Sequence, residues 1–234
     1  MIVRPAAGTL HLITQPDHAA LARRIMERWA PLHGAERRNS ILLAVEEHDN
    51  GWHEPDSAPS INPATGRIFD FVTAPASVRQ GVWPRGVARL AGDDVWAAAL
   101  VAQHALTVYD RYRGDAEWEP FFERIAVSRD ALVMQARRTL PQLTLDYSYV
   151  RIGDLISLIF CNEWDEEQTY GTWGFRRAGN RVIVTPDALA GCELPIAVRA
   201  RTIPDRPYES DADLRDAIRR APSVTLHGTV SGAL

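Results

Sequence analysis

Five ionisable side chains in this sequence have the types and surroundings of metal ligands. His18, His48 and His104 lie among apolar residues at helical spacing. Asp49 follows His48 directly, and Asp154 lies in the apolar run VRIGDLISL. This periodicity turns all five side chains toward the interior. Because one cation offsets the cost of burying several carboxylates and imidazoles together, we predict that they bind a divalent transition metal such as iron, manganese or zinc.

Helical patterns must position these residues. Pro16 and Asp17 suit the start of the first pattern, and Asn50-Gly51 suits the end of the second. The patterns that carry the five side chains span residues 15–32, 36–49, 93–113 and 143–164. For any one histidine the alternative is a hydrogen-bonded residue of the core. Separate local hydrogen bonds of this kind would have to explain the burial of all five side chains if they do not share one site.

Two stretches around these residues, AVEEHDNGW and VRIGDLISL, resemble the HD-domain superfamily of metal-dependent phosphohydrolases. Within that superfamily the chain is similar to a bacterial branch with no assigned substrate. The resemblance rests on four matched positions rather than on a long motif. It implies that His18, His48, Asp49 and Asp154 hold a first metal ion. It also implies that His104 binds a second ion or positions a phosphate.

The stretch 51–92 is rich in Pro and Gly, which predicts a long irregular excursion of the kind that often serves function. Trp52, Asp56 and Arg67 are predicted substrate contacts, because they follow the His-Asp pair closely. Arg67 has the geometry to bind an anionic group with two hydrogen bonds. By the same resemblance His53 stands in for a basic group that contacts substrate. The alternatives are a loop histidine at 53 and a solvated ion pair at 67.

Three functions fit this set of residues. The first is a metal-dependent hydrolase of a small phosphoester or phosphoanhydride, in which metal-activated water attacks phosphorus and Asp49, His104 and His53 are catalytic. The second is a di-iron oxygenase, because the chain also resembles the oxygenases of the HD superfamily, and it requires two metal ions. The third is a non-catalytic domain that binds a metal or a partner.

The expected fold is mainly α. An HD-domain-like helical bundle over residues 1–164 would contain the irregular excursion 51–92, and a small β-rich C-terminal subdomain or lid would cover residues 165–234. In the C-terminal part, short segments rich in β-branched and aromatic residues alternate with turn signals. These predicted strands span residues 170–176, 181–185, 196–203 and 223–229.

Composition narrows the partners and the chemistry. The 234 residues carry a net charge of −4, which disfavours nucleic acid as the main partner. All 26 cationic residues are arginine, so Schiff-base chemistry on lysine is excluded. The sequence shows neither a membrane-spanning apolar run nor a secretory signal, and we expect a cytoplasmic protein that acts on a small molecule. A homodimer is left open.

Overall fold

Eight α-helices and seven β-strands form the regular structure of residues 1–233, the residues that this computed structural model describes. The strands are β1 (Ile2–Ala6), β2 (Thr9–Ile13), β3 (Gln168–Tyr170), β4 (Trp173–Ala178), β5 (Arg181–Thr185), β6 (Glu193–Pro204) and β7 (Ser223–Gly232). The helices are α1 (Gln15–Met26), α2 (Arg38–Glu47), α3 (His53–Ser57), α4 (Ala76–Ala91), α5 (Val95–Val108), α6 (Glu119–Gln135), α7 (Leu140–Asn162) and α8 (Asp211–Arg220). Short 3-10 helices at Ala30–Leu32, Asn50–Trp52 and Asp110–Tyr112 lie in the connections.

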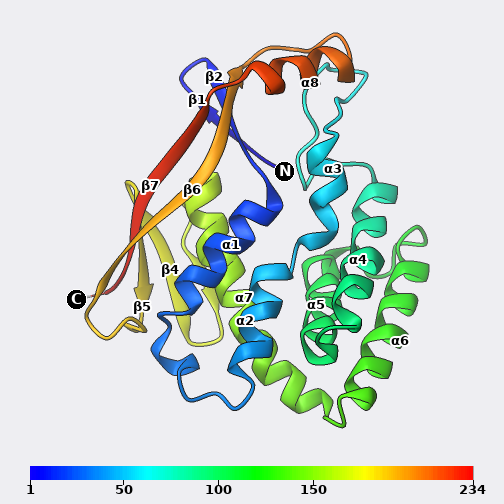
Figure 1. Cartoon of the computed structure of the whole chain (residues 1–234), viewed down its shortest axis with the longest axis vertical. Coiled ribbons are helices and arrows are strands. Elements are labelled where there is room, and N and C mark those ends of the chain that lie inside the picture. Colours follow the sequence, from blue (N-terminus) through cyan, green and yellow to red (C-terminus); the bar gives the residue numbers. More distant parts are fainter. Residues whose placement is uncertain (234) are drawn as a thin grey trace.

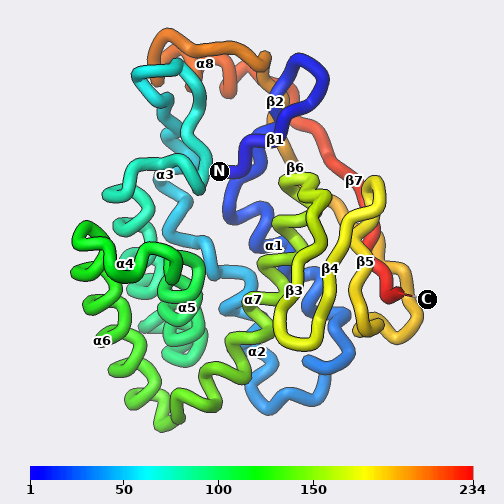
Figure 2. The backbone as a smooth tube through the Cα atoms, turned by 180° about the vertical axis from the view of Figure 1, so that it is seen from behind, coloured from blue at the N-terminus to red at the C-terminus, as the bar shows by residue number. Residues whose placement is uncertain are grey.

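The elements are arranged in three layers (Figures 1 and 2). The sheet forms one side, and α1 and α7 pack against it through contacts with β6, β4 and β5. Beyond α1, α2 and α7 lies the pair α4 and α5, with α6 on the outside. One large hydrophobic core runs through all three layers, because its buried residues come from the sheet as well as from the helices. The layer formed by α1, α2 and α7 therefore lies at the centre of the molecule.

The prediction of a mainly α fold with a small β-rich piece is wrong, as is its description as all-α. The structure is α/β: 50% of it is helical and 21% lies in a mixed seven-stranded sheet that curls into a half-barrel. The strand order is β1-β2-β6-β7-β5-β4-β3, and the neighbours are antiparallel except for β5 and β7. The sheet joins both ends of the chain, since β2 from the N-terminal hairpin pairs with β6.

The N-terminal hairpin of β1 and β2 was not predicted from the sequence. Its turn is formed by Ala7 and Gly8, both with positive φ, rather than by a typical Asn-Gly pair. Pro5 lies within β1, which is tolerated because β1 is an edge strand of the sheet. Leu10 and Leu12 of β2 are buried in a second, smaller core beneath α8. The hairpin gains its stability from these distant partners, which local patterns do not reveal.

The stretch 51–92 is more regular than predicted. It contains the short helix α3 and the long helix α4, which continues through Pro84 in its interior. The irregular part is confined to residues 58–75. Ile61 from this part packs in the core beneath α8 together with Tyr208. In the C-terminal part, the predicted strand 181–185 coincides with β5.

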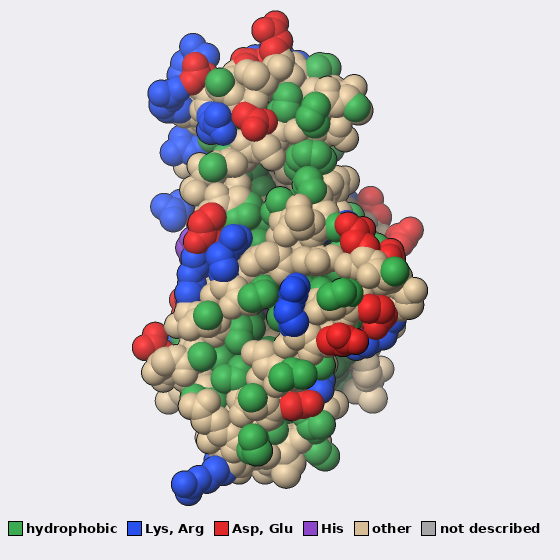
Figure 3. Space-filling model, turned by 90° about the vertical axis from the view of Figure 1, so that its right-hand side faces the viewer, with side chains coloured by type: hydrophobic (Ala, Val, Ile, Leu, Met, Phe, Trp, Pro, Cys, Tyr) green, Lys and Arg blue, Asp and Glu red, His purple; other side chains and the backbone are tan. Residues whose placement is uncertain are grey.

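No helix among residues 1–233 combines the length and the apolar character needed to cross a membrane. A few large apolar side chains are nevertheless exposed. Most of them belong to α6 and the first turns of α7, where Val127, Met134, Leu140 and Leu145 are exposed. On the face shown in Figure 3, hydrophobic side chains are interspersed with charged ones from top to bottom. The remaining one, Val72, lies in the loop before α4.

Candidate metal centre

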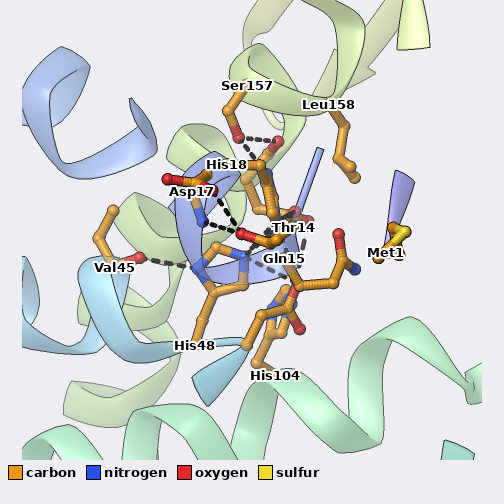
Figure 4. Close-up of polar contacts among 12 residues, drawn as sticks. Met1, Thr14, Gln15, Asp17, His18, Val45, His48, His104, Ser157 and Leu158 are labelled. Atoms are coloured by element: carbon orange, nitrogen blue, oxygen red, sulfur yellow. Dashed lines mark hydrogen bonds and ion pairs between the residues drawn. The ribbon is translucent and has the colours of Figure 1, made fainter. Parts of the chain in front are cut away.

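The five predicted ligands meet where α1, α2, α5 and α7 converge. His18 comes from α1, His104 from α5 and Asp154 from α7, while His48 and Asp49 follow the last turn of α2. All five residues are buried, with at most 6% of their surface exposed. Figure 4 shows the three imidazole rings, each from a different part of the chain, turned toward a common centre. The structure thus brings together residues that are up to 136 positions apart.

Two glycines allow the elements that carry these residues to approach closely. Gly51 comes soon after the His-Asp pair, and a Cβ atom there would lie 1.9 Å from the carbonyl oxygen of Val82 in α4. Gly153 precedes Asp154 on α7, and a Cβ atom there would lie 2.8 Å from Cγ of Met26 in α1. A side chain at position 51 would displace the segment that follows the His-Asp pair from α4, and one at position 153 would crowd α1 and α2 against α7.

Each histidine uses its Nδ1 atom for a hydrogen bond away from the centre. These bonds orient the rings and leave every Nε2 atom directed at the shared site. Histidines that bind a metal through one ring nitrogen commonly form such a hydrogen bond with the other. The partners are the Ser157 hydroxyl (2.8 Å from His18), the Val45 carbonyl oxygen (2.7 Å from His48) and the Tyr147 hydroxyl (3.1 Å from His104). Because the Val45 carbonyl only accepts, Nδ1 of His48 carries a proton.

The spacing of the converging atoms fits a transition-metal ion. Neighbouring ligand atoms that are each about 2.1 Å from an ion lie about 2.9–3.4 Å apart. The Nε2 atom of His18 is 3.0 Å from Oδ2 of Asp49 and 3.2 Å from Nε2 of His48. The Nε2 atom of His48 is 3.4 Å from Oδ1 of Asp154. His18, His48 and Asp49 therefore fit a single cation, and Asp154 approaches the same His48 nitrogen from the side of His104.

His104 extends the cluster on the other side of Asp154. Its Nε2 atom is 3.9 Å from Oδ2 of Asp154, the carboxylate oxygen that does not approach His48. Potential ligand atoms of His48, His104 and Asp154 lie within 4.8 Å of one another, as do those of His18, His48 and Asp49. The two groups share His48, whose one unprotonated nitrogen can bind only one ion, so they are alternative positions for a cation.

Electrostatics of the cluster favour positive charge at its centre. Burial alone would lower the pKa of His48, but the Asp49 and Asp154 carboxylates outweigh it and raise this pKa to about 9. Burial would raise the pKa of Asp154, yet the hydrogen bond with His48 and nearby positive charge lower it overall. Desolvation lowers the pKa of His104 to about 3, so this ring is neutral near pH 7. A cation can thus replace the proton on His48.

Arg151 is a member of the site that the sequence analysis missed. Its Nη1 atom donates a hydrogen bond of 2.6 Å to Oδ2 of Asp154. The side chain is 25% exposed, so the guanidinium reaches from the buried cluster toward solvent. A signal was present in the sequence, because Arg151 precedes Asp154 by one helical turn and residues at that spacing share a helix face.

A pocket of about 240 Å³ opens onto the cluster. Asp49, His104 and Asp154 line it, whereas the fully buried rings of His18 and His48 lie behind them. The remaining wall is mostly aromatic and apolar, with Gln15 and Thr107 as its uncharged polar side chains and two arginines. These wall residues are Gln15, Trp52, Phe71, Val72, Trp83, Thr107, Val108, Tyr109, Arg111, Arg151, Leu158 and Trp164. Asp49, Asp154 and His104 are therefore the cluster residues that an incoming molecule meets.

Two of the predicted substrate residues have different surroundings. Trp52 is buried and lines this pocket. Asp56 is outside the pocket lining, where it binds the N-terminal ammonium group of Met1 at 2.5 Å. It also accepts a hydrogen bond of 2.6 Å from the backbone N–H of Gln15. Asp56 thus connects α3 to the start of α1, and both of its carboxylate oxygens have partners.

His53 and Arg67 do not join the cluster. His53 is exposed at the first position of α3 and is outside the lining of the pocket. Arg67 is 53% exposed and forms an ion pair with Asp205, on the side of the molecule where α8 lies. The excursion folds as a hairpin-like loop toward α8, so closeness in sequence to the His-Asp pair did not place Arg67 at the site.

Fold and site together define an α/β protein with a buried His/Asp cluster at the bottom of a small aromatic pocket. The chain belongs to the family described as "Protein of unknown function (DUF3891)", whose model matches residues 1–205. The matched span includes all five cluster residues and extends through β6. No curated protein and no solved structure matches the chain.

Proposed function

We propose that this protein is a metal-dependent hydrolase of a small phosphorylated compound. The observation that carries the proposal is the position of the cluster at the bottom of a pocket, with Asp49, His104 and Asp154 in its wall. A purely structural metal site has all its ligands closed around the ion, whereas a catalytic site keeps a position open to substrate. The resemblance of the His-Asp stretches to the HD-domain phosphohydrolases supports the same activity.

The donor set defines the ion that the protein would hold. His18, His48, Asp49 and Asp154 would be its ligands, and imidazole with carboxylate suits zinc, manganese or iron. When bound, such an ion polarises a phosphoryl oxygen and lowers the pKa of a coordinated water toward neutrality. The chain itself supplies the binding, orientation and charge around that chemistry.

Two side chains are suited to act on a substrate beside these ligands. Arg151 uses one of its N–H groups for Asp154 and retains others for an anionic oxygen in the pocket. His104 is neutral near pH 7, and Tyr147 fixes its Nδ1 atom. Its Nε2 atom is therefore available for a hydrogen bond to a water or a substrate oxygen, which makes His104 a positioning group.

One observation favours a second candidate, a di-iron oxygenase. His104 and Oδ2 of Asp154, beyond the first group, are the donors that a second ion would use. Two irons per chain, together with oxygen consumption in the presence of organic substrates, would favour this candidate. One ion per chain and hydrolysis without oxygen uptake would favour the hydrolase.

The test combines metal analysis with hydrolysis. Protein purified without chelator is assayed by elemental analysis and then incubated with a panel of phosphomonoesters and phosphodiesters, including p-nitrophenyl phosphate. We expect about one bound transition-metal ion per chain and phosphate release that chelator abolishes. Asp49→Asn and Asp154→Asn should each lose both the metal and the hydrolysis.

Asp146→Asn is the matched control. Asp146 is equally buried on α7, but it pairs with Arg37 and accepts a hydrogen bond of 2.8 Å from Trp96, outside the cluster. Its variant should retain the metal even if its folding stability falls. Metal-free protein, or metal-loaded protein that hydrolyses no member of the panel, would contradict the proposed function.

A further inference from the structure

The pocket above the cluster is small and has an aromatic wall. Five aromatic side chains line it, from five separate parts of the chain, and three of them are buried. They are Trp52, Phe71, Trp83, Tyr109 and Trp164. The indole of Trp83 lies between the cluster and the rest of the wall, with its ring centre 5.6 Å from that of His104 and 5.9 Å from that of Tyr109. An occupant that reaches His104 therefore meets aromatic faces at once.

Positive charge is concentrated beside the cluster. Arg151 lies in the wall next to Asp154, and Arg111 is exposed in the same wall. The ligand carboxylates would be neutralised by a bound cation, which leaves the guanidinium of Arg151 to attract an anionic group. The polar and the aromatic parts of the pocket thus point to an anion with a flat apolar body.

The rim of the pocket supports an apolar body as well. Val72 is 43% exposed and is the one exposed large hydrophobic side chain among residues 1–233 that lines this pocket. Phe71, next to it, is only half-buried. Apolar side chains left open to solvent at the mouth of a pocket are typical of ligand-binding sites. The other exposed large hydrophobic side chains, on α6 and α7, do not line this pocket.

Size limits the occupant. The pocket has a volume of about 240 Å³. It is below the range of about 300–1,000 Å³ that pockets for drug-sized ligands occupy. One ring and one phosphoryl group suit this space, whereas a nucleotide, with a base, a sugar and phosphate, has to leave part of itself outside.

We infer that the substrate is a monocyclic aromatic phosphomonoester, whose phosphoryl group binds Arg151 and whose ring lies against Trp83 and the neighbouring aromatic wall. This inference rests on the proposed function, since it names the substrate class of the same site. Hydrolysis would break the bond between phosphorus and the ester oxygen, with water supplying the new oxygen on phosphorus and the proton of the released alcohol or phenol. No oxidant or further reactant is required.

Binding of phosphonates, which are not hydrolysed, tests the inference separately from catalysis. Protein loaded with Zn²⁺ is titrated with phenylphosphonate and with methylphosphonate, and binding is followed by calorimetry. Burial of the ring should make phenylphosphonate bind about ten- to hundredfold more tightly. Val72→Asn, at the exposed rim, should reduce the ratio of the phenylphosphonate affinity to the methylphosphonate affinity at least threefold. The binding of methylphosphonate itself should not weaken. Trp83→Leu should reduce the ratio further.

The two arginines are separated in the same assay. Arg151→Gln should weaken both phosphonates about tenfold or more at unchanged zinc content, and Arg151→Lys should restore part of the loss. If Arg111→Gln removes phosphonate binding and Arg151→Gln does not, the role given to Arg151 is overturned. Equal affinity for the two phosphonates, or no binding of either by zinc-loaded protein, overturns the substrate class. The proposed function is judged separately, by metal content and by phosphate release from the wider panel.

Discussion

Removal of the metal should lower the melting temperature of the protein without unfolding it at room temperature. The buried carboxylates of Asp49 and Asp154 lie beside protonated His48 and Arg151 in the metal-free state. Two cations therefore balance two anions, and the cluster stays intact without an ion. Because an ion replaces only the proton on His48, we expect the metal-free protein to be folded and less stable.

The magnitude follows from linkage between binding and folding. A ligand at about 1,000 times its dissociation constant stabilises the native state by about 4 kcal/mol. For chains of about 150–250 residues, 1 kcal/mol corresponds to about 2–4 °C in melting temperature. Addition of Zn²⁺ or Mn²⁺ at this excess should therefore raise the melting temperature by about 8–16 °C. Chelator should reverse the increase.

The assay is differential scanning calorimetry at pH 7 with chelator or with added metal. Asp154→Asn should abolish most of the metal-dependent increase, because it removes a ligand between His48 and His104. Asp146→Asn should lower the melting temperature in both conditions and preserve the difference between them. Identical melting temperatures for wild-type protein with chelator and with excess metal would refute the reasoning.

Three further outcomes are expected. The first concerns pH. The pKa of His48 is about 9 in the metal-free protein, against an ordinary value of 6.5. Its proton therefore stabilises the fold fully below about pH 6.5, and this stabilisation is lost as the pH rises through 9. Because metal binding must displace the proton of His48, the metal affinity should rise about tenfold per pH unit between pH 6.5 and 9. Calorimetry in buffers of different ionisation enthalpy measures this proton release, and its absence would contradict the prediction. Ser157→Ala removes the partner of Nδ1 of His18 and should weaken metal binding about 10- to 100-fold in a competition titration, and unchanged affinity would argue against this orienting role. Gly51→Ala should lower the free energy of unfolding in urea by about 3 kcal/mol or more, because the added Cβ atom clashes with α4. Gly81→Ala, inside α4 and with open space around it, should raise the free energy of unfolding by about 0.5–1 kcal/mol. Equal effects of the two substitutions would show that the close approach of Gly51 to α4 is not needed.

Helical periodicity carried most of the information about the cluster. The spacing of apolar residues around His18, His104 and Asp154 depends on the 3.6-residue repeat, which is a local property of the chain. The structure places these residues on α1, α5 and α7 with their side chains buried together. Which side of each helix faces inward could thus be predicted from the sequence, whereas the binding of a metal ion at the cluster remains a prediction.

Residues without a periodic signal were harder to place. Arg67 follows the His-Asp pair in sequence, yet the loop that carries it folds toward α8. Trp83 and Tyr109, which line the pocket, lie in α4 and just beyond α5, and no motif in the sequence marks either of them. A pocket wall is assembled from elements whose mutual positions depend on packing, so no single segment identifies it.

The amino-acid sequence by itself determined the helices that carry the cluster and the inward direction of its histidines and aspartates, because both depend on neighbours within one or two turns. Only the tertiary structure decided that β2, at the start of the chain, pairs with β6, more than 180 residues later, and that an α/β fold results. Strand pairing depends on partners distant in sequence, and β1 and β2 are too short to be stable without them. The same long-range packing gathers Arg151 and the aromatic wall around the cluster.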